Sequence, residues 1–307
     1  MSSAGQKTDM EHKNLNKDEL DLFTHLMSLP NPYGFPLPLL ESNFKVDGST
    51  IWRFPVKDDP VTHTRNIQSL PMKEDDIFIA AYMKCGTHWV AEMLHMLLKG
   101  SIKYSEKTKE STMLEVVCDL DTLTHMQSPR VLNSHLYMVH LPREIVQKKI
   151  KIIHLLRQPK DVAVSWYHHM KHMHSTVAFT FEKYLDAYVQ EDLIPTSHQF
   201  NYLRQMSEFE KLHPDHPIIH IHYEDLKLDP VPVVQKLAKF IGVSAKEAFC
   251  QQVVEACHFD MMIKADESRK LPANIEDKIT KKAFYRKGIM GDWKNHFTVA
   301  QNEMFDD

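Results

Sequence analysis

Residues 77–100 constrain the fold of this chain most, because they join a strand pattern to a helix pattern across a very short turn. The apolar run at residues 77–82 has the length and composition of a strand buried on both faces. Apolar residues then recur at helical spacing up to Gly100, where a helix stop is expected. Such a turn directs backbone N–H groups and the positive end of a helix toward one point, and so predicts an anion site.

Further strands and helices are expected to alternate along the rest of the chain. Apolar, β-leaning runs predict strands at residues 131–134, 151–156 and 218–222. Helical spacing is found between and after them, at residues 162–172, 181–191, 199–212, 233–241 and 245–257. This alternation predicts an α/β fold with a central parallel sheet covered by helices on both faces. Ligands of such sheets gather beyond the carboxyl ends of the strands.

The remaining stretches predict one domain with irregular surroundings. No Gly/Ser/Pro-rich linker divides the 307 residues, so we expect a disordered tail at 1–25 and a single domain at 26–307. Residues 30–40 contain four prolines and fit either a surface strap or a wall of an acceptor pocket. Residues 52–60 and 66–71 are expected to form loops or short edge pieces. The charged, irregular stretch 101–126 is expected to be a mobile flap.

Charge and cysteine content exclude several classes of protein. A formal net charge of −4 argues against a partner that is nucleic acid or a membrane surface, although a local basic pocket remains possible. The four cysteines form no CxxC pair or disulfide framework, which indicates reduced thiols and a cytoplasmic location. The N-terminal stretch is polar, and no apolar run approaches 18 residues, so neither a signal peptide nor an anchor is expected.

The turn itself is not the common nucleotide-binding loop. GxxxxGK[ST] places Lys after its last Gly, whereas Lys84 here precedes Gly86. The pattern Tyr-x-Lys-x-Gly-Thr-x-Trp, from Tyr82 to Trp89, instead resembles the 5′-phosphosulfate loop of the cytosolic sulfotransferases. Four further segments resemble that family in the same order, from about residue 30 onward. The resemblance implies a P-loop-like α/β fold and transfer of a sulfuryl group from 3′-phosphoadenosine 5′-phosphosulfate (PAPS) to a small acceptor.

The resemblance assigns the donor site residue by residue. Lys84 would neutralise charge on the oxygen that leaves sulfur. Thr87 and the amides of Cys85 and Gly86 would hold the 5′-phosphate, and Trp89 would stack on adenine. Cys85 replaces the usual Ser, and His88 replaces a Thr whose hydroxyl donates to the phosphate. An imidazole can donate too, but it is larger and titrates near neutral pH.

Three later segments complete the expected grip on the nucleotide. Residues 156–167, LRQPKDVAVSWY, resemble the family segment that binds the 3′-phosphate through Arg157 and Ser165. Pro159 and Asp161 suit the start of a helix, so Ser165 falls near its first turn. In the family this Ser also restrains the loop Lys. The adenine would be bound by two aromatic residues, and the 3′-phosphate also by a basic fork followed by Gly-Asp-Trp-Lys; these residues are Tyr223, Phe259, Arg286, Lys287 and Gly288.

The acceptor side is expected to centre on His135. The segment Asn133-Ser134-His135-Leu136 resembles the family's Lys-Thr-His-Leu, in which the His removes the acceptor proton. Asn133 stands where phenol-type members carry a Lys that also stabilises the transferring sulfuryl group, and where hydroxysteroid-type members have a small polar residue. His169 falls where an aromatic residue often lines the acceptor site. The resemblance therefore implies that Asn133, His135 and His169 meet the acceptor.

Two weaker patterns concern a metal and a dimer. His168 and His172 have the i, i+4 spacing of a metal pair in a cluster that extends to His174, but no carboxylate or Cys is suitably spaced nearby, so a solvated or pocket-lining face and no metal are expected. Near the C-terminus, Lys-x-x-x-Thr-Val-x-x-x-Glu resembles the family's dimer motif and implies a small homodimer interface through Lys294, Thr298, Val299 and Glu303.

The expected activity is sulfuryl transfer to a hydroxyl or amine of a small lipophilic acceptor such as a phenol, steroid or other alcohol, with adenosine 3′,5′-bisphosphate (PAP) as product. A kinase is disfavoured, because no Walker Lys-[Ser/Thr] or acidic metal partner is apparent. A dehydratase that acts through a sulfated alcohol stays open. The departures at Cys85, His88 and Asn133 also leave open a PAP- or PAPS-binding regulatory protein with weak or no turnover.

Overall fold

The computed structural model describes residues 43–46, 49–52, 56, 58–173, 180–189, 199–276 and 284–307. The expected tail at 1–25, the proline-rich stretch 30–40 and His174 lie outside these residues.

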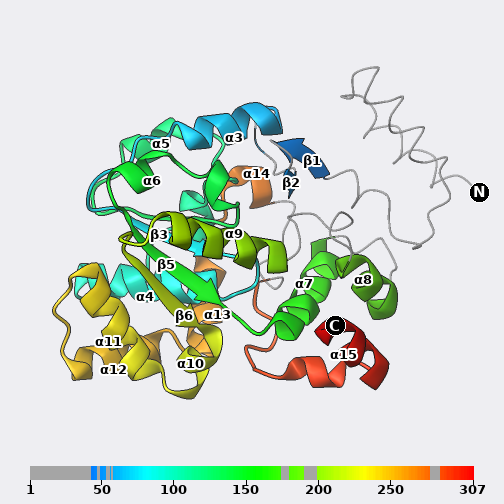
Figure 1. The fold of residues 1–307 in the computed structure, drawn as a ribbon. Helices are drawn as coiled ribbons and strands as arrows, with labels where there is room; N and C mark the ends of the chain where they lie inside the picture. The colour runs from blue at the N-terminus through cyan, green and yellow to red at the C-terminus, as the bar shows by residue number, and fades with distance from the viewer. Residues whose placement is uncertain are drawn as a thin grey trace, which may run out of the picture.

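A four-stranded parallel sheet forms the centre of the molecule (Figure 1). Its strands are β3 (Ile77–Ala81), β4 (Val131–Ser134), β5 (Lys151–Leu156) and β6 (Ile218–His222), in the order β4-β3-β5-β6. All residues of β3 are buried, as its uninterrupted apolar sequence predicts. The predicted strands and their parallel arrangement are confirmed. Because the register pairs Ala80 with both Ser134 and His154, the carboxyl ends of β3, β4 and β5 lie at one edge.

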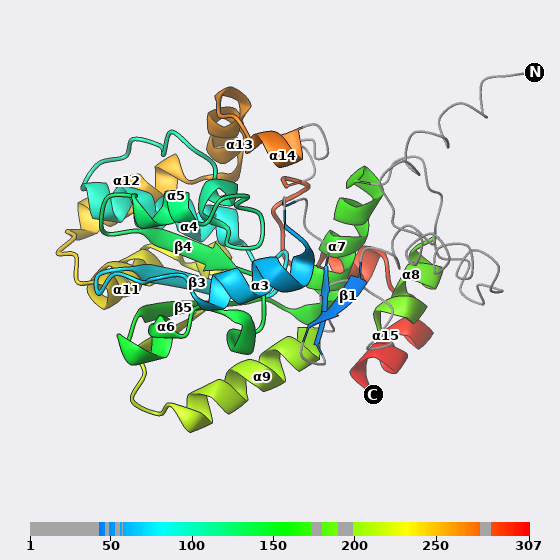
Figure 2. The same ribbon diagram turned by 90° about the horizontal axis from the view of Figure 1, so that it is seen from above.

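Helices cover both faces of this sheet. Figure 2 shows α4 (Thr87–Lys99) and α12 (Glu247–Ala256) on one face, and α9 (Gln199–Leu212) along the opposite face. The apolar stripe of α4 packs Val90, Met93, Leu94 and Leu97 into the main core. Gly100 caps α4 with a φ of 60°, a left-handed conformation that glycine adopts without strain. The predicted stop of this helix is therefore confirmed.

The helix that follows β5 starts earlier than its apolar pattern predicts. α7 (Pro159–Met173) begins at Pro159, which suits a first helical position because its missing N–H would be unpaired there anyway. Ser165 therefore lies in the second turn instead of the first. In Figure 1, α7, α8 (Phe181–Tyr188) and α15 (Val299–Asp306) gather beyond the carboxyl end of β5.

Other described elements surround the sheet. Part of the stretch 66–71, expected to be a loop, is helical, because Asp59 caps a helix that starts with Pro60. Residues 43–46 and 49–52 form an antiparallel pair outside the main sheet. The remaining elements are β1 (Asn43–Val46), β2 (Ser49–Trp52), α3 (Pro60–Gln68), η2 (Lys109–Thr112), α5 (Asp121–Thr124), η3 (Met138–His140), α6 (Glu144–Gln147), α10 (Tyr223–Leu228), α11 (Pro230–Ile241), α13 (Phe259–Ser268), α14 (Ala273–Glu276) and η5 (Asp292–Asn295).

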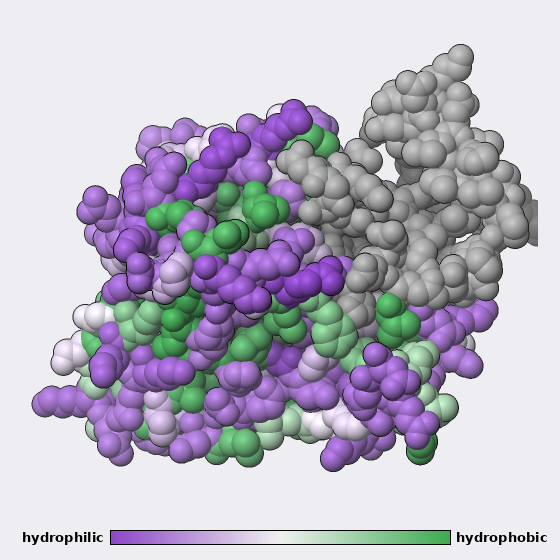
Figure 3. Space-filling view, viewed as in Figure 1, coloured by the Kyte–Doolittle hydropathy of each residue, from purple (hydrophilic) through white to green (hydrophobic). Residues whose placement is uncertain are grey.

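Apolar side chains fill the core, and hydrophilic residues cover much of the surface. Two buried apolar clusters share the sheet, one on each face, with Ile79 and Phe78 of β3 in different clusters because successive side chains alternate. Figure 3 shows hydrophilic residues over much of one face, with hydrophobic residues between them. Among the described residues, no helix combines the length and apolar character that crossing a bilayer requires.

Candidate functional site

The turn between β3 and α4 adopts the geometry of an anion site. Lys84 and Gly86 both have positive φ, 65° and 99°, which turns the chain sharply and lets α4 begin at Thr87. No side chain caps this helix start, so the positive end of α4 is available to a ligand. A side chain at Gly86 would lie 3.0 Å from the ring of Tyr223, so the backbone and this aromatic ring approach closely.

Positive charge is concentrated beside this turn although the whole chain is acidic. Burial, with the nearby charges of Arg157 and Lys109, lowers the pKa of Lys84 to about 7. The Lys84 Nζ lies 3.3 Å from His169 Nδ1. Arg157, directly after β5, donates to the Lys84 carbonyl at 2.8 Å, and its guanidinium lies 4.3 Å from the centre of the Tyr223 ring. A bound anion would relieve this crowding of cations.

The C-terminal basic segment reaches the same region through Asp161. The Asp161 carboxylate accepts from the backbone N–H groups of Gly291 and Trp293, at 2.6 and 3.0 Å, which fixes this segment to the start of α7. Arg286 and Lys287 both pair with Asp292, at 2.5 and 2.8 Å. The predicted fork is therefore held as one unit, and its cations share a buried carboxylate.

Aromatic residues line the other side of the turn. Trp89 meets the edge of Tyr223 with ring centres 5.7 Å apart, and its Nε1 is buried without a hydrogen-bond partner. Phe259 meets Tyr285 at 6.0 Å. Gly288, with φ of 62°, lies so close to Phe259 that an added Cβ would be 2.4 Å from the ring. The contacts thus place Trp89 beside Tyr223, and Phe259 beside the basic segment.

His135 has the environment of a neutral base. Its Nδ1 lies 2.8 Å from the Ala81 carbonyl, which can only accept, so Nδ1 carries the proton and Nε2 keeps its lone pair. Burial, with the nearby charge of Lys109, holds the pKa of His135 well below its usual value. Its backbone N–H donates to the buried Glu115 carboxylate at 2.6 Å, which fixes the residue in place.

Lys109 and Glu110 form a buried charged pair that was not expected from the sequence. Lys109 Nζ lies 3.4 Å from His135 Nε2 and 3.3 Å from Asn133 Oδ1. Glu110 Oε1 lies 2.7 Å from His88 Nε2, so the unusual loop residue pairs with a carboxylate. Both belong to the stretch 101–126, whose residues from Thr108 to Val117 are largely buried instead of forming a free flap. The adjacent opposite charges of Lys109 and Glu110 are visible in the sequence, but the burial of their side chains is not.

Of the remaining predicted residues, some lie beside the turn between β3 and α4, and others lie away from it. His169 is buried, touches Lys84 and stacks on Trp166 with ring centres 5.2 Å apart. Burial raises the pKa of the Cys85 thiol to about 12, so it stays protonated. His172 is exposed, while His168 is partly buried against His296, and burial lowers the pKa of His168 to about 4. His168 and His172 therefore face different surroundings.

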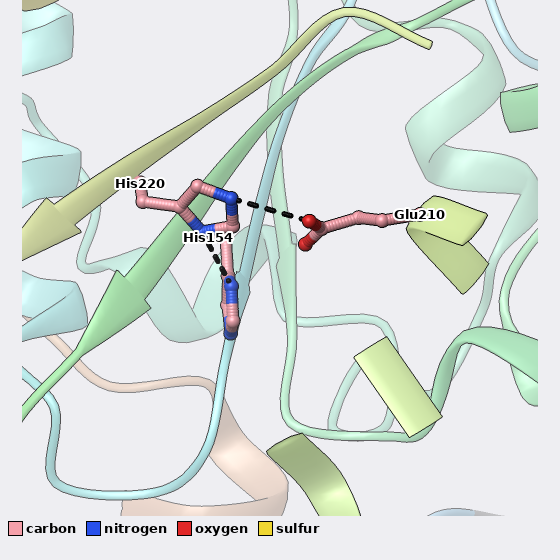
Figure 4. Close-up of side chains that lie close together, drawn as sticks. All are labelled: His154, Glu210 and His220. Atoms are coloured by element: carbon pink, nitrogen blue, oxygen red, sulfur yellow. Dashed lines mark hydrogen bonds and ion pairs between the residues drawn. The ribbon is translucent and has the colours of Figure 1, made fainter. Parts of the chain in front are cut away.

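Another histidine cluster lies between the sheet and α9. His154 of β5, His220 of β6 and Glu210 of α9 converge in Figure 4. The two Nδ1 atoms are 3.1 Å apart, and His220 Nε2 lies 3.4 Å from Glu210 Oε2. Burial and the neighbouring His220 lower the pKa of His154 to about 3, so it is neutral. A hydrogen bond from His154 to His220, and another from His220 to Glu210, account for this arrangement without an ion.

Comparison with known proteins assigns most of the chain to one family. The sulfotransferase domain family matches residues 74–307. Dog sulfotransferase 1B1 is 33% identical over 285 residues, which cover 88% of this chain and 93% of the relative. Bovine sulfotransferase 1A1 is 32% identical over 253 residues, which cover 78% of this chain and 84% of the relative.

Solved structures agree with this grouping. Mouse sulfotransferase SULT7A1 complexed with PAP superposes with a TM-score of 0.71 at 26% identity, over 86% of this chain and 92% of that one. A retinol dehydratase in complex with androsterone and PAP has a TM-score of 0.69 at 17% identity, over 90% and 92% of the two chains, and so shares the fold.

Proposed function

This chain belongs to the sulfotransferase family and transfers a sulfuryl group from PAPS to a small acceptor; from that premise we propose which of its residues hold the donor and which perform the transfer. One observation carries the assignment. Lys84 and Arg157 converge at the uncapped start of α4, while the neutral base His135 lies at the end of the adjacent strand β4. An anion bound at the turn would therefore present its reactive end toward an imidazole.

The donor is held at both ends. The Lys84 ammonium, the Thr87 hydroxyl and the amides of Cys85, Gly86 and His88 bind the 5′-phosphosulfate at the helix start. The 3′-phosphate is bound by Arg157, Ser165, Arg286, Lys287 and the Gly288 amide. Each of the two planar guanidinium groups can donate twice to a phosphate. Trp89, Tyr223 and Phe259 provide the aromatic surfaces for adenine.

The transfer follows from the protonation states. His135 Nε2 takes the proton of the acceptor hydroxyl as that oxygen attacks sulfur. The bond from sulfur to the bridging phosphate oxygen breaks, and that oxygen leaves with the electron pair as part of PAP. The Lys84 ammonium neutralises the developing negative charge there. Asn133 contacts Lys109 beside His135, and His169 contacts Lys84, so both lie next to the place where the acceptor oxygen attacks.

The direct experiment measures transfer of label from ³⁵S-PAPS to a panel of phenols, sterols, other alcohols and amines, alongside calorimetric binding of PAP. Labelled, stable sulfate esters or sulfamates support this function. Release of inorganic sulfate with formation of an alkene would indicate the dehydratase. PAP binding without any turnover would indicate a regulatory protein and would contradict the assignment of His135.

Replacing Gly288 with Ala should weaken PAP binding by at least about tenfold, equivalent to about 1.4 kcal/mol. The new methyl group would lie 2.4 Å from the Phe259 ring, so that ring must leave its place. Gly100→Ala is the matched control, because Gly100 has almost the same φ but no atom within 4 Å of the added Cβ. It should lower the melting temperature and leave the Kd for PAP unchanged. Equal Kd values for both variants would remove Phe259 from the adenine site.

We propose a homodimer through the segment that contains Lys294, Thr298, Val299 and Glu303. These residues are exposed, and Val299, 76% exposed, presents an apolar side chain to solvent at the start of α15. Val299→Glu should shift the protein from dimer to monomer in light scattering, whereas Leu212→Glu, at an equally exposed position on α9, should not. A wild-type monomer at tens of micromolar would contradict this proposal.

A reducing compartment such as the cytoplasm is also proposed. Three of the four cysteines, Cys85, Cys250 and Cys257, are buried thiols outside any disulfide. Cell fractionation tests this location, and recovery of the protein outside the cytosolic fraction would contradict it.

A further inference from the structure

Lys109 is a buried ammonium at the acceptor end of the site. It lies in η2, and its side chain is only 5% exposed. Its Nζ is 3.4 Å from His135 Nε2, 3.3 Å from Asn133 Oδ1 and 3.5 Å from Met113 Sδ. Each of these three contacts is with an uncharged group. An ammonium withdrawn from water is unfavourable unless a negative charge comes near it.

Each carboxylate near Lys109 also has another partner at shorter distance or by hydrogen bond. Glu110 Oε1 is 3.8 Å from Lys109 Nζ but 2.7 Å from His88 Nε2, so its closer partner is the imidazole. Although burial opposes it, the nearby charges of His88 and Lys109 hold the pKa of Glu110 below its usual value. Glu115 accepts from the backbone N–H of His135. Lys109 therefore retains the capacity to bind an anion that enters beside His135.

Asn133 holds Lys109 in this position. Its Nδ2 donates to the Lys109 carbonyl at 3.0 Å and to Thr112 Oγ1 at 3.2 Å, and its Oδ1 accepts from the Lys109 ammonium. These bonds fasten η2 to the end of β4. Asn133 thus has no charge of its own at the transfer site, but it directs an ammonium from another segment to that place.

We propose that Lys109 is a catalytic residue that donates hydrogen bonds to the nonbridging oxygens of the sulfuryl group during transfer, and that Asn133 positions it. This inference rests on the proposed function. In the free enzyme the ammonium donates to His135 Nε2, because the Nδ1 proton is directed to Ala81. The acceptor hydroxyl takes over that bond to Nε2, and the ammonium turns to the sulfuryl oxygens.

Lys109 changes no covalent bond in this step. The acceptor proton still goes to His135 Nε2, and the leaving oxygen is still neutralised by Lys84. The added cation reduces the repulsion between the anionic sulfuryl group and the incoming oxygen. With Lys84 on the leaving-group side and Lys109 on the base side, positive charge lies at both ends of the in-line transfer.

The test begins with Lys109→Met, which keeps most of the side-chain volume and removes the charge. We expect kcat to fall about 10²-fold, the usual size for losing one preorganised donor. The Kd for PAP should stay within about twofold, because PAP lacks the sulfuryl group that Lys109 contacts. Lys107→Met is the control, since Lys107 is exposed and only two residues away; it should match wild type in both measurements.

Two further readouts separate catalysis from structural support. The acid limb of the pH profile of kcat/KM should move to higher pH in Lys109→Met, because removing a cation beside His135 makes its protonation easier. Adding Asn133→Lys to Lys109→Met should raise kcat again by at least about tenfold, because it supplies an ammonium close to the place that the Lys109 ammonium occupied.

Unchanged kcat together with an unmoved acid limb in Lys109→Met would overturn the inference while leaving the sulfotransferase assignment intact. Parallel losses of kcat and PAP binding, with no gain from Asn133→Lys, would also overturn it and indicate a structural role. Absence of transfer by the wild-type chain to every acceptor would instead count against the proposed function itself.

Discussion

His135→Ala is expected to lower kcat for sulfuryl transfer by about 10²- to 10⁴-fold, the range typical for removing a general base. The neutral imidazole that holds its proton on Nδ1 and offers Nε2 is lost, and no other described group occupies that position at the end of β4. Initial rates with ³⁵S-PAPS and any acceptor found in the panel would measure the effect. PAP binding should persist, because His135 lies on the acceptor side.

The control for this variant is His125→Ala, which removes an exposed histidine ten residues away. It should leave rate and binding unchanged. The wild-type pH profile gives a second check. Because burial and Lys109 keep the pKa of His135 well below its usual value, the base form persists as pH falls, and the acid limb of kcat/KM should lie well below pH 6.5. Transfer that survives His135→Ala would remove this residue from its role.

Lys84→Met is expected to lower kcat by about 10²- to 10³-fold. The backbone of Lys84 holds positive φ in the turn, and its ammonium lies against His169, where the bond to the leaving oxygen must break. PAP should also bind more weakly, because this cation faces the 5′-phosphate. Lys99→Met, at the exposed far end of α4, is the matched control and should behave as wild type.

Protonation of Lys84 offers an independent readout. In the free protein its pKa is about 7, and a bound polyanion must raise that pKa because it stabilises the ammonium. At pH 8 the wild-type chain should therefore take up protons when PAP binds, and its Kd should rise as pH increases above about 7. Calorimetry in two buffers of different ionisation enthalpy measures this uptake. The same uptake in Lys84→Met would show that another group titrates.

The departures from the family pattern are linked in space. His88 and Asn133 lie 45 residues apart along the chain by number, yet both contact η2, where Glu110 meets His88 and Lys109 meets Asn133. If the chain had lost its activity, nothing would require His88 and Asn133 to have matching partners. A charged partner at each position instead favours an altered but working site, and the transfer assay decides between these outcomes.

The predicted strands 131–134, 151–156 and 218–222 and the helix 199–212 match the structure residue for residue. The apolar pattern is strongest in 151–156 and 218–222. Prediction failed where local signals were weak. α3 begins with Asp59-Pro60, a capping arrangement that a propensity-based interpretation took for a loop. The start of α7 at Pro159, in contrast, agrees with the helix start that Pro159 and Asp161 indicate, although the apolar pattern begins three residues later.

The sequence alone determined the family, the parallel α/β order and the turn that carries Lys84, since each depends on residues close together in the chain. Tertiary structure decided which charges reach the acceptor side. Lys109 and His135 are 26 residues apart, and Arg157 and Lys84 are 73 apart. These contacts depend on strand register and on which segments are buried, and burial also sets the protonation states of Lys84 and His135. A local sequence pattern contains neither the strand register nor the burial of a segment.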